Sequence, residues 1–131
     1  MNSDSAERMP LESLEGQEAG NVARPARLEE LEAQFDRDMA KELVSAYLED
    51  TADVMEKMQE SIFNRDGKSL KSHAHMLKGA SRIVVAQELE GLCKEMEEYS
   101  LGANWLKAEA LFEKLNRAFQ ELVEYLRQYL K

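Results

Sequence analysis

His75 is surrounded by cationic residues in a chain whose formal net charge is −9. Each residue of a helix advances by about 100° around the axis, so the segment DGKSLKSHAHMLKGASRIVV, residues 66–85, can be placed on a helical wheel. The core face of this wheel carries Leu70, Leu77 and Val84. His75 lies on the opposite face, which we expect to meet solvent, together with Lys68, Lys71, Lys78 and Arg82.

An exposed imidazole in this setting suits the chemistry of phosphoryl transfer. A neutral imidazole is a nucleophile that can take a phosphoryl group on a ring nitrogen. Neighbouring cations disfavour imidazolium and would stabilise the dianionic phosphoryl group, Lys78 most directly because it is one turn away. Gly79 costs a helix about 1 kcal/mol relative to alanine, and we interpret it as clearance for the backbone of another molecule. The simpler alternative is a solvated helix face that contains lysine and histidine without a further role.

Two other residues could suggest chemistry, but both are interpreted as structural. His73 falls beside Leu77 on the wheel, and we expect it to face inward as a hydrogen-bonded histidine at the edge of the bundle. A metal site shared by His73 and His75 is excluded because residues two apart on a helix diverge. Cys93 lies on an apolar stripe and is expected to be a small buried hydrophobe. No metal site is predicted.

The spacing of apolar residues predicts helices almost throughout residues 27–131. We expect a short helix over residues 28–35, a second from a cap at Asp36 or Asp38 to about residue 64, and a third over about 67–84 with Asp66 as its cap. A fourth helix carries Leu89, Leu92, Cys93 and Met96, and a turn follows at residues 100–104. The second and last helices are expected to bury Met39, Leu43, Val44, Tyr47, Val54, Met55, Met58, Ile62, Phe63, Ala108, Leu111, Leu115, Phe119, Leu122, Leu126 and Tyr129. These elements predict an all-α fold: an antiparallel four-helix bundle with a short additional N-terminal helix.

Length and charge restrict the organisation and the partners of the chain. Its 131 residues leave room for one domain, which we place at residues 27–131 after a mobile tail at residues 1–26. The acidic balance argues against a nucleic-acid binder and against a binder of anionic membranes. A single cysteine, no apolar run near the ~18 residues of a membrane span and no secretory signal favour the cytoplasm.

The residues around His75 resemble a known family signature. The segment Ala74-His75-Met76-Leu77-Lys78-Gly79-Ala80-Ser81 is similar to that of histidine phosphotransfer (HPt) domains, Ala-His-x-Leu-Lys-Gly followed by two small residues. The segment Leu89-x-x-Leu92-Cys93-x-x-Met96-Glu97 resembles the family's Leu-x-x-Leu-Cys-x-x-Leu-Glu. One departure is that Val84-Val85-Ala86 stands where the family often has Leu-Gly-Ala, so a glycine is missing from the turn that ends the active helix.

The resemblance implies a phosphocarrier that catalyses nothing by itself. It implies His75 as the phosphoacceptor, Lys78 as the cation that stabilises the phosphate and Gly79 as the clearance residue. The partners would be response-regulator receiver domains and a hybrid sensor kinase, with no cofactor on this chain and Mg²⁺ on the receiver. We expect a monomer, and we expect receivers to dock on Lys71, Ser72, Met76 and Arg82.

Three alternatives are weighed against this interpretation. Dimerisation helices of a sensor kinase carry an acidic residue directly after the histidine, whereas this chain has Met76 and no Gly-rich nucleotide-binding segment. The phosphorylatable domain of a chemotaxis kinase shares the fold, but a chain this short lacks that enzyme's other domains. An HPt-like adaptor that binds receivers without accepting phosphate stays open as the alternative function.

Overall fold

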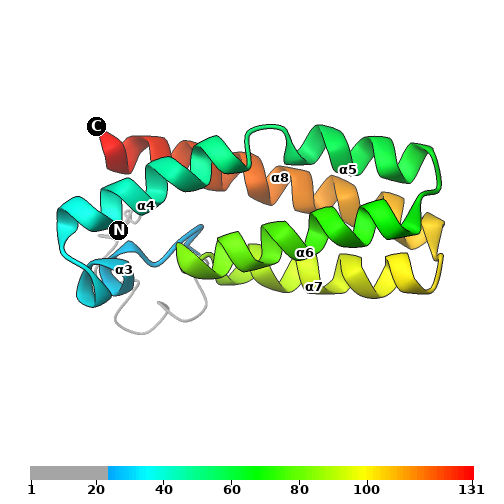
Figure 1. Cartoon of the computed structure of the whole chain (residues 1–131), viewed down its shortest axis with the longest axis horizontal. Helices are drawn as coiled ribbons and strands as arrows, with labels where there is room; N and C mark the ends of the chain where they lie inside the picture. The colour runs from blue at the N-terminus through cyan, green and yellow to red at the C-terminus, as the bar shows by residue number, and fades with distance from the viewer. Residues whose placement is uncertain (1–23) are drawn as a thin grey trace, which may run out of the picture.

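The computed structural model describes residues 24–131, and this part of the chain is built from helices alone. The predicted all-α class is confirmed (Figure 1). The helices are α3 Leu28–Gln34, α4 Arg37–Asp50, α5 Val54–Phe63, α6 Gly67–Ile83, α7 Gln87–Leu101 and α8 Trp105–Leu130.

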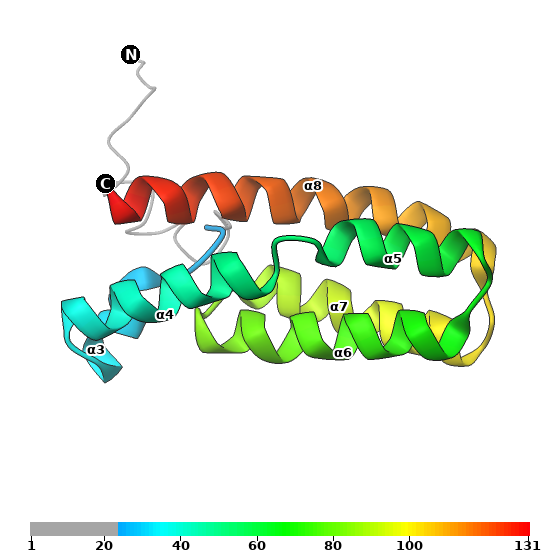
Figure 2. The same ribbon diagram turned by 45° about the horizontal axis from the view of Figure 1, so that its top comes forward.

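Four antiparallel arms form the bundle. Figure 1 shows α4 and α5 end to end as one interrupted arm, while α6, α7 and α8 are the other three. α6 packs against α7 and α5, and α8 packs against α7, α4 and α5. Figure 2 shows the short α3 at one end of the molecule, beside the start of α4. The arrangement is the predicted four-helix bundle with an added N-terminal helix.

Polar side chains cap three of the helices at their N-termini. Asp36 accepts a hydrogen bond from the backbone N–H of Met39 at 2.8 Å, which starts α4. Asp66 accepts one from the N–H of Ser69 at 3.0 Å, as predicted, and so starts α6. Asn104 does the same for α8. These bonds satisfy N–H groups that the first turn of a helix leaves without a partner.

The arm formed by α4 and α5 corrects one prediction. A single helix from residue 36 to about residue 64 was expected, but the structure has a break at residues 51–53. Thr51 is fully buried, and its hydroxyl donates to the carbonyl of Tyr47 at 2.7 Å. This side-chain bond to the preceding turn bends helices. The N–H of Val54 then bonds only three residues back, to Thr51 at 3.1 Å, which tightens the turn and restarts the helix in a new direction.

The core follows the predicted stripes with two exceptions. Met39 is 43% exposed and Phe63 is 84% exposed, so their prediction as core residues is wrong. Met39 lies in the first turn of α4 and Phe63 is the last residue of α5, where helical spacing does not guarantee a neighbour to pack against. Leu43 and Tyr129 are half-buried. The other residues expected to be buried in the second and last helices lie in the core: Val44, Tyr47, Val54, Met55, Met58, Ile62, Ala108, Leu111, Leu115, Phe119, Leu122 and Leu126.

Three helices end on a residue with a left-handed backbone, and none of the three is glycine. Arg65, Val85 and Ala103 have φ of 55°, 57° and 52° and follow α5, α6 and α7. At the end of α6 the N–H of Ala86 reaches back to the carbonyl of Ser81 at 2.9 Å, which is the closing bond of a Schellman motif. The turn therefore keeps the geometry that glycine favours, although valine stands where the resemblance has glycine.

The predicted tail, residues 1–26, lies mostly outside the described residues. Of its last residues, Ala26 is fully buried, and the next N–H, that of Arg27, bonds to the carbonyl of Val85 at 3.0 Å. The predicted turn at residues 100–104 is shorter than expected, because α7 continues to Leu101. No helix in the described part of the chain is long and apolar enough to cross a membrane.

Candidate functional site

α6 presents His75 to solvent, as its helical wheel predicts. Leu70, Ala74, Leu77 and Ser81 are the buried residues of this helix. Ser81 and Tyr47 share a buried hydrogen bond of 2.9 Å, which ties α6 to α4 and fixes the rotation of α6 about its axis. The side chain of His75 is 71% exposed on the opposite face. Core packing on one side of α6 therefore positions the imidazole on the other.

A carboxylate from α7 lies between His75 and Lys78. Glu97 Oε2 is 3.3 Å from His75 Nδ1 and 3.0 Å from Lys78 Nζ. Glu97 is 14% exposed and Lys78 is 19% exposed, so this ion pair is largely shielded from water. Neither neighbour is aligned as a hydrogen-bond donor, and the buried Oε2 atom has no hydrogen-bond partner among the described residues. The carboxylate thus pairs with the ammonium group of Lys78 and lies beside the imidazole of His75.

The predicted docking residues flank His75 on both sides. Lys71 and Ser72 line a shallow depression that also includes Lys68 and His75. A second depression, between α6 and α7, includes Lys78 and Arg82. Met76, the next residue after His75, is 41% exposed. The surface around the imidazole therefore combines cationic, small polar and apolar groups.

Gly79 leaves open space beside the site. A β-carbon built at this position would meet no atom within 4 Å. Nothing inside the protein therefore requires a glycine here, although glycine weakens an exposed helix. The observation fits the interpretation of Gly79 as clearance for another molecule.

His73 and Cys93 are less exposed than His75. His73, which is predicted to face inward as a hydrogen-bonded histidine at the edge of the bundle, is half-buried on α6. Cys93 is fully buried, as predicted, and its burial raises the pKa of the thiol to about 12. This thiol is therefore protonated at neutral pH and is a poor nucleophile.

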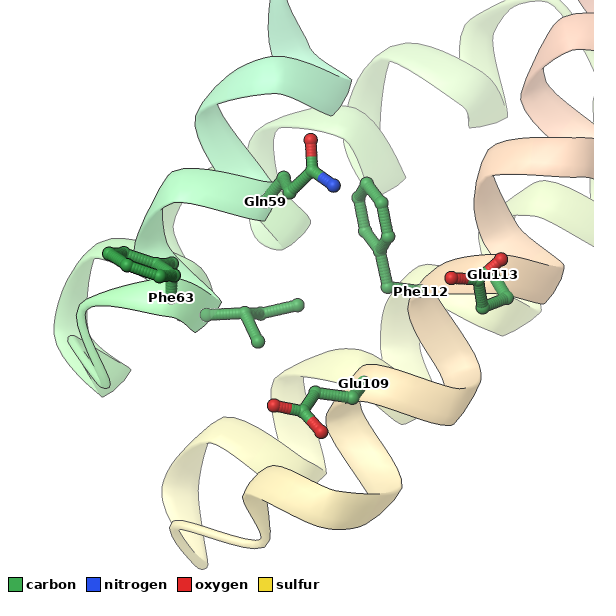
Figure 3. Close-up of a pocket in the computed structure, with 6 residues that line it drawn as sticks. Gln59, Phe63, Glu109, Phe112 and Glu113 are labelled. Carbon is green, nitrogen blue, oxygen red and sulfur yellow. The ribbon is translucent and has the colours of Figure 1, made fainter.

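Another pocket lies between α5 and α8 (Figure 3). Figure 3 shows Phe63 and Phe112 with Gln59, Glu109 and Glu113 around the hollow. It has carboxylates and apolar groups but no imidazole, thiol or amine, and none of its lining residues comes from α6 or α7. Within residues 24–131 no group of three side chains is placed to hold a metal ion. The exposed imidazole is thus the better candidate for chemistry.

One acidic residue of the site, Glu97, and a second acidic residue beside it, Glu90, were not identified from the sequence. Glu97 contacts both His75 and Lys78, and Glu90 Oε2 accepts a hydrogen bond from Arg82 Nε at 2.7 Å. Two of the four cations around His75 are therefore paired with α7 carboxylates. A wheel of α6 cannot show them, because they belong to another helix. The only sequence signal for Glu97 is its position at the end of the Leu-x-x-Leu-Cys-x-x-Met-Glu segment.

Comparisons with known proteins agree with this geometry. The Hpt domain family matches residues 42–129. The chain is also similar to the crystal structure of histidine-containing phosphotransfer protein B (HptB) from Pseudomonas aeruginosa PAO1, with a TM-score of 0.73 and 26% identity. That match covers 81% of this chain and 94% of the other. No curated protein matches the chain. The predicted resemblance to HPt domains is confirmed.

Proposed function

Because the chain belongs to the Hpt domain family, we propose that His75 accepts a phosphoryl group from the aspartate of one receiver domain and passes it to another. Hpt domains serve histidine phosphotransfer in two-component signalling, together with receiver domains and kinases. The observation that carries the assignment to His75 is its exposure opposite the core face of α6, with Lys78 one turn away and open space at Gly79.

The proposed step is a nucleophilic substitution at phosphorus. A ring nitrogen of neutral His75 attacks the aspartyl phosphate, an N–P bond forms, and the P–O bond to the aspartyl group breaks so that the aspartate leaves as a carboxylate. Nδ1 lies beside Glu97, so Nε2 is the nitrogen left to attack. Passing the phosphoryl group to a second receiver is the same step in reverse.

The remaining parts of the reaction belong to the partner. Mg²⁺ and the carboxylates that bind it would lie on the receiver, because phosphoryl transfer of this kind needs a cation beside the phosphate oxygens. This chain would contribute the nucleophile, Lys78 and a docking surface. Lys71, Ser72, Met76 and Arg82 would contact the receiver, with the cationic side chains facing its acidic pocket. We also propose that the protein acts as a monomer in the cytoplasm.

Two histidine substitutions test the assignment. Phosphorylated receiver domains from the same organism are mixed with each variant, and labelling is followed by Phos-tag electrophoresis. His75→Gln should abolish labelling, because glutamine has no nucleophilic ring nitrogen, while His73→Gln should leave it largely intact. Circular dichroism checks that both variants are folded. Labelling that survives His75→Gln would contradict the assignment.

An adaptor that binds receivers without accepting phosphate is the second candidate. The ion pairs of Lys78 and Arg82 with α7 carboxylates favour it slightly, because they reduce the positive charge that is free to meet a phosphoryl group. An adaptor would bind a phosphorylated receiver in a pull-down and leave His75 unlabelled. Incubation with ATP alone should label neither the wild type nor any variant, since the proposed carrier takes its phosphate from a receiver.

A further inference from the structure

We infer that Glu97 holds Lys78 back from the phosphoryl group and thereby sets how long phosphorylated His75 survives. The inference rests on the proposed phosphotransfer at His75. It starts from the buried Oε2 atom of Glu97, which lies 3.0 Å from Lys78 Nζ and 3.3 Å from His75 Nδ1. A mostly buried carboxylate without a hydrogen-bond partner on this oxygen calls for an explanation.

Lys78 is already occupied before any phosphate arrives. It lies three residues after His75, so the two side chains share one face of α6 and the ammonium group can reach a phosphoryl group on the ring. The structure instead places this ammonium beside Glu97, and both side chains are largely shielded from water. Charge interactions strengthen when the groups are removed from water, so the pair competes with the phosphate for the same cation.

Glu97 also places negative charge beside the phosphorylated ring. A phosphoryl group on His75 would bring about two further negative charges near a carboxylate that is already 3.3 Å from the ring. Two effects raise the free energy of the phosphorylated protein: the Glu97 carboxylate repels the phosphoryl group, and its pairing with Lys78 weakens the attraction of Lys78 for that group. Both effects favour release of the phosphoryl group to a receiver or to water. In hydrolysis, the P–N bond breaks and the water oxygen forms a P–O bond. Of the two protons of water, one goes to the leaving ring nitrogen and the other stays on the inorganic phosphate.

Glu90 provides a matched comparison on the same helix. Its carboxylate accepts a hydrogen bond from Arg82 Nε at 2.7 Å, so it also pairs an α7 acid with an α6 cation. Unlike Glu97, Glu90 forms no ion pair with His75 or Lys78 in the described part of the chain. Glu97→Gln and Glu90→Gln each remove one negative charge with little change in shape. A general effect of net charge would act in both variants.

The test measures the lifetime of phosphohistidine and the transfer equilibrium. Each variant is labelled by a phosphorylated receiver and purified, and decay of the label is followed alone and with unphosphorylated receiver. Glu97→Gln should lengthen the half-life of phosphohistidine by about 3- to 10-fold and shift the transfer equilibrium toward this chain by a similar factor. A tenfold change is about the size expected from the loss of one charge–charge interaction. Glu90→Gln should change either quantity by less than about twofold. Lys78→Ala should shorten the half-life, and adding Glu97→Gln to Lys78→Ala should recover less than Glu97→Gln gains alone.

The outcomes separate this inference from the function on which it rests. A wild-type protein that takes no label at His75 overturns both. A labelled wild type whose half-life and equilibrium are unchanged by Glu97→Gln overturns the inference alone. Equal slowing of transfer in both directions by Glu97→Gln, with the equilibrium unchanged, would also overturn it, because it would show that Glu97 only orients the ring.

Discussion

At the scale of single residues, the two faces of α6 have different roles: one packs in the core and the other carries the reactive side chain. The packed face of α6 fixes the helix, and the solvent face carries His75 with Lys78 and Gly79. Glu97 approaches from α7 and meets both His75 and Lys78. The reactive group is therefore held by ordinary core packing, while its electrostatic surroundings depend on two helices.

Gly79 offers a test that separates stability from function. Gly79→Ala should stabilise the fold by about 1 kcal/mol, because alanine is the better helix former and the added methyl group meets open space. The same methyl group should slow phosphotransfer by obstructing the receiver. Thermal unfolding and receiver-to-His75 transfer rates measure the two effects. Gly91→Ala, which also meets open space in the middle of a helix, is the control for stability. A Gly79→Ala variant that transfers at the wild-type rate would contradict the clearance role.

Sequence reasoning identified the residues of α6 and missed their neighbours on α7. His75, Lys78 and Gly79 follow from the geometry of one helix, since the face of each residue depends only on its number. The contacts of Glu97 and Glu90 depend on how α6 and α7 pack together. A helical wheel contains no such information, so the predicted site was more cationic than the observed one.

At the scale of elements, helix starts were easier to predict than interruptions and ends. The caps at Asp36 and Asp66 follow from residue type. The break between α4 and α5 was missed because Tyr47 and Val54 are seven residues apart, which is the spacing of one apolar face in a continuous helix. The left-handed residue Val85 was also unexpected, because a β-branched residue is a poor choice for this conformation.

Ala103 allows a direct test of the strained helix ends. Its φ is 52°, and the left-handed conformation costs about 1–2 kcal/mol for a residue with a β-carbon. Ala103→Gly should therefore raise the free energy of unfolding by up to about 1 kcal/mol, measured by urea denaturation, because the greater entropy of unfolded glycine offsets part of the gain. Ala110→Gly, at an exposed position inside α8, should lower it by about the same amount. Destabilisation by both variants would show that Ala103 is not strained.

At the scale of the whole molecule, a polar contact joins two distant segments of the chain at one end of the bundle (Figure 1). The hydroxyl of Tyr129 on α8 donates a hydrogen bond to Glu32 on α3. This bond, with help from Arg37, lowers the pKa of Glu32 below its ordinary value of 4.5. Burial, together with the bond to Glu32, raises the pKa of Tyr129 to about 12. The contact links two segments that are 97 residues apart.

This contact predicts a specific loss of stability in acid. A carboxyl group whose pKa is lower in the folded protein stabilises it above the unfolded pKa, and this contribution disappears as the pH falls through the folded value. Tyr129→Phe should therefore lose less stability than the wild type between pH 5 and pH 3. The melting temperature followed across this range measures the effect. Identical acid profiles for the wild type and Tyr129→Phe would contradict the prediction.

The most direct measurement for the central claim locates the phosphoryl group itself. The wild-type protein is labelled by a phosphorylated receiver, digested at neutral to alkaline pH, where phosphohistidine survives, and sequenced by tandem mass spectrometry with electron-transfer fragmentation. The account predicts an added phosphoryl group on the imidazole of His75 and none on His73. A phosphoryl group on any other residue, or a protein that binds the receiver and stays unlabelled, would contradict it.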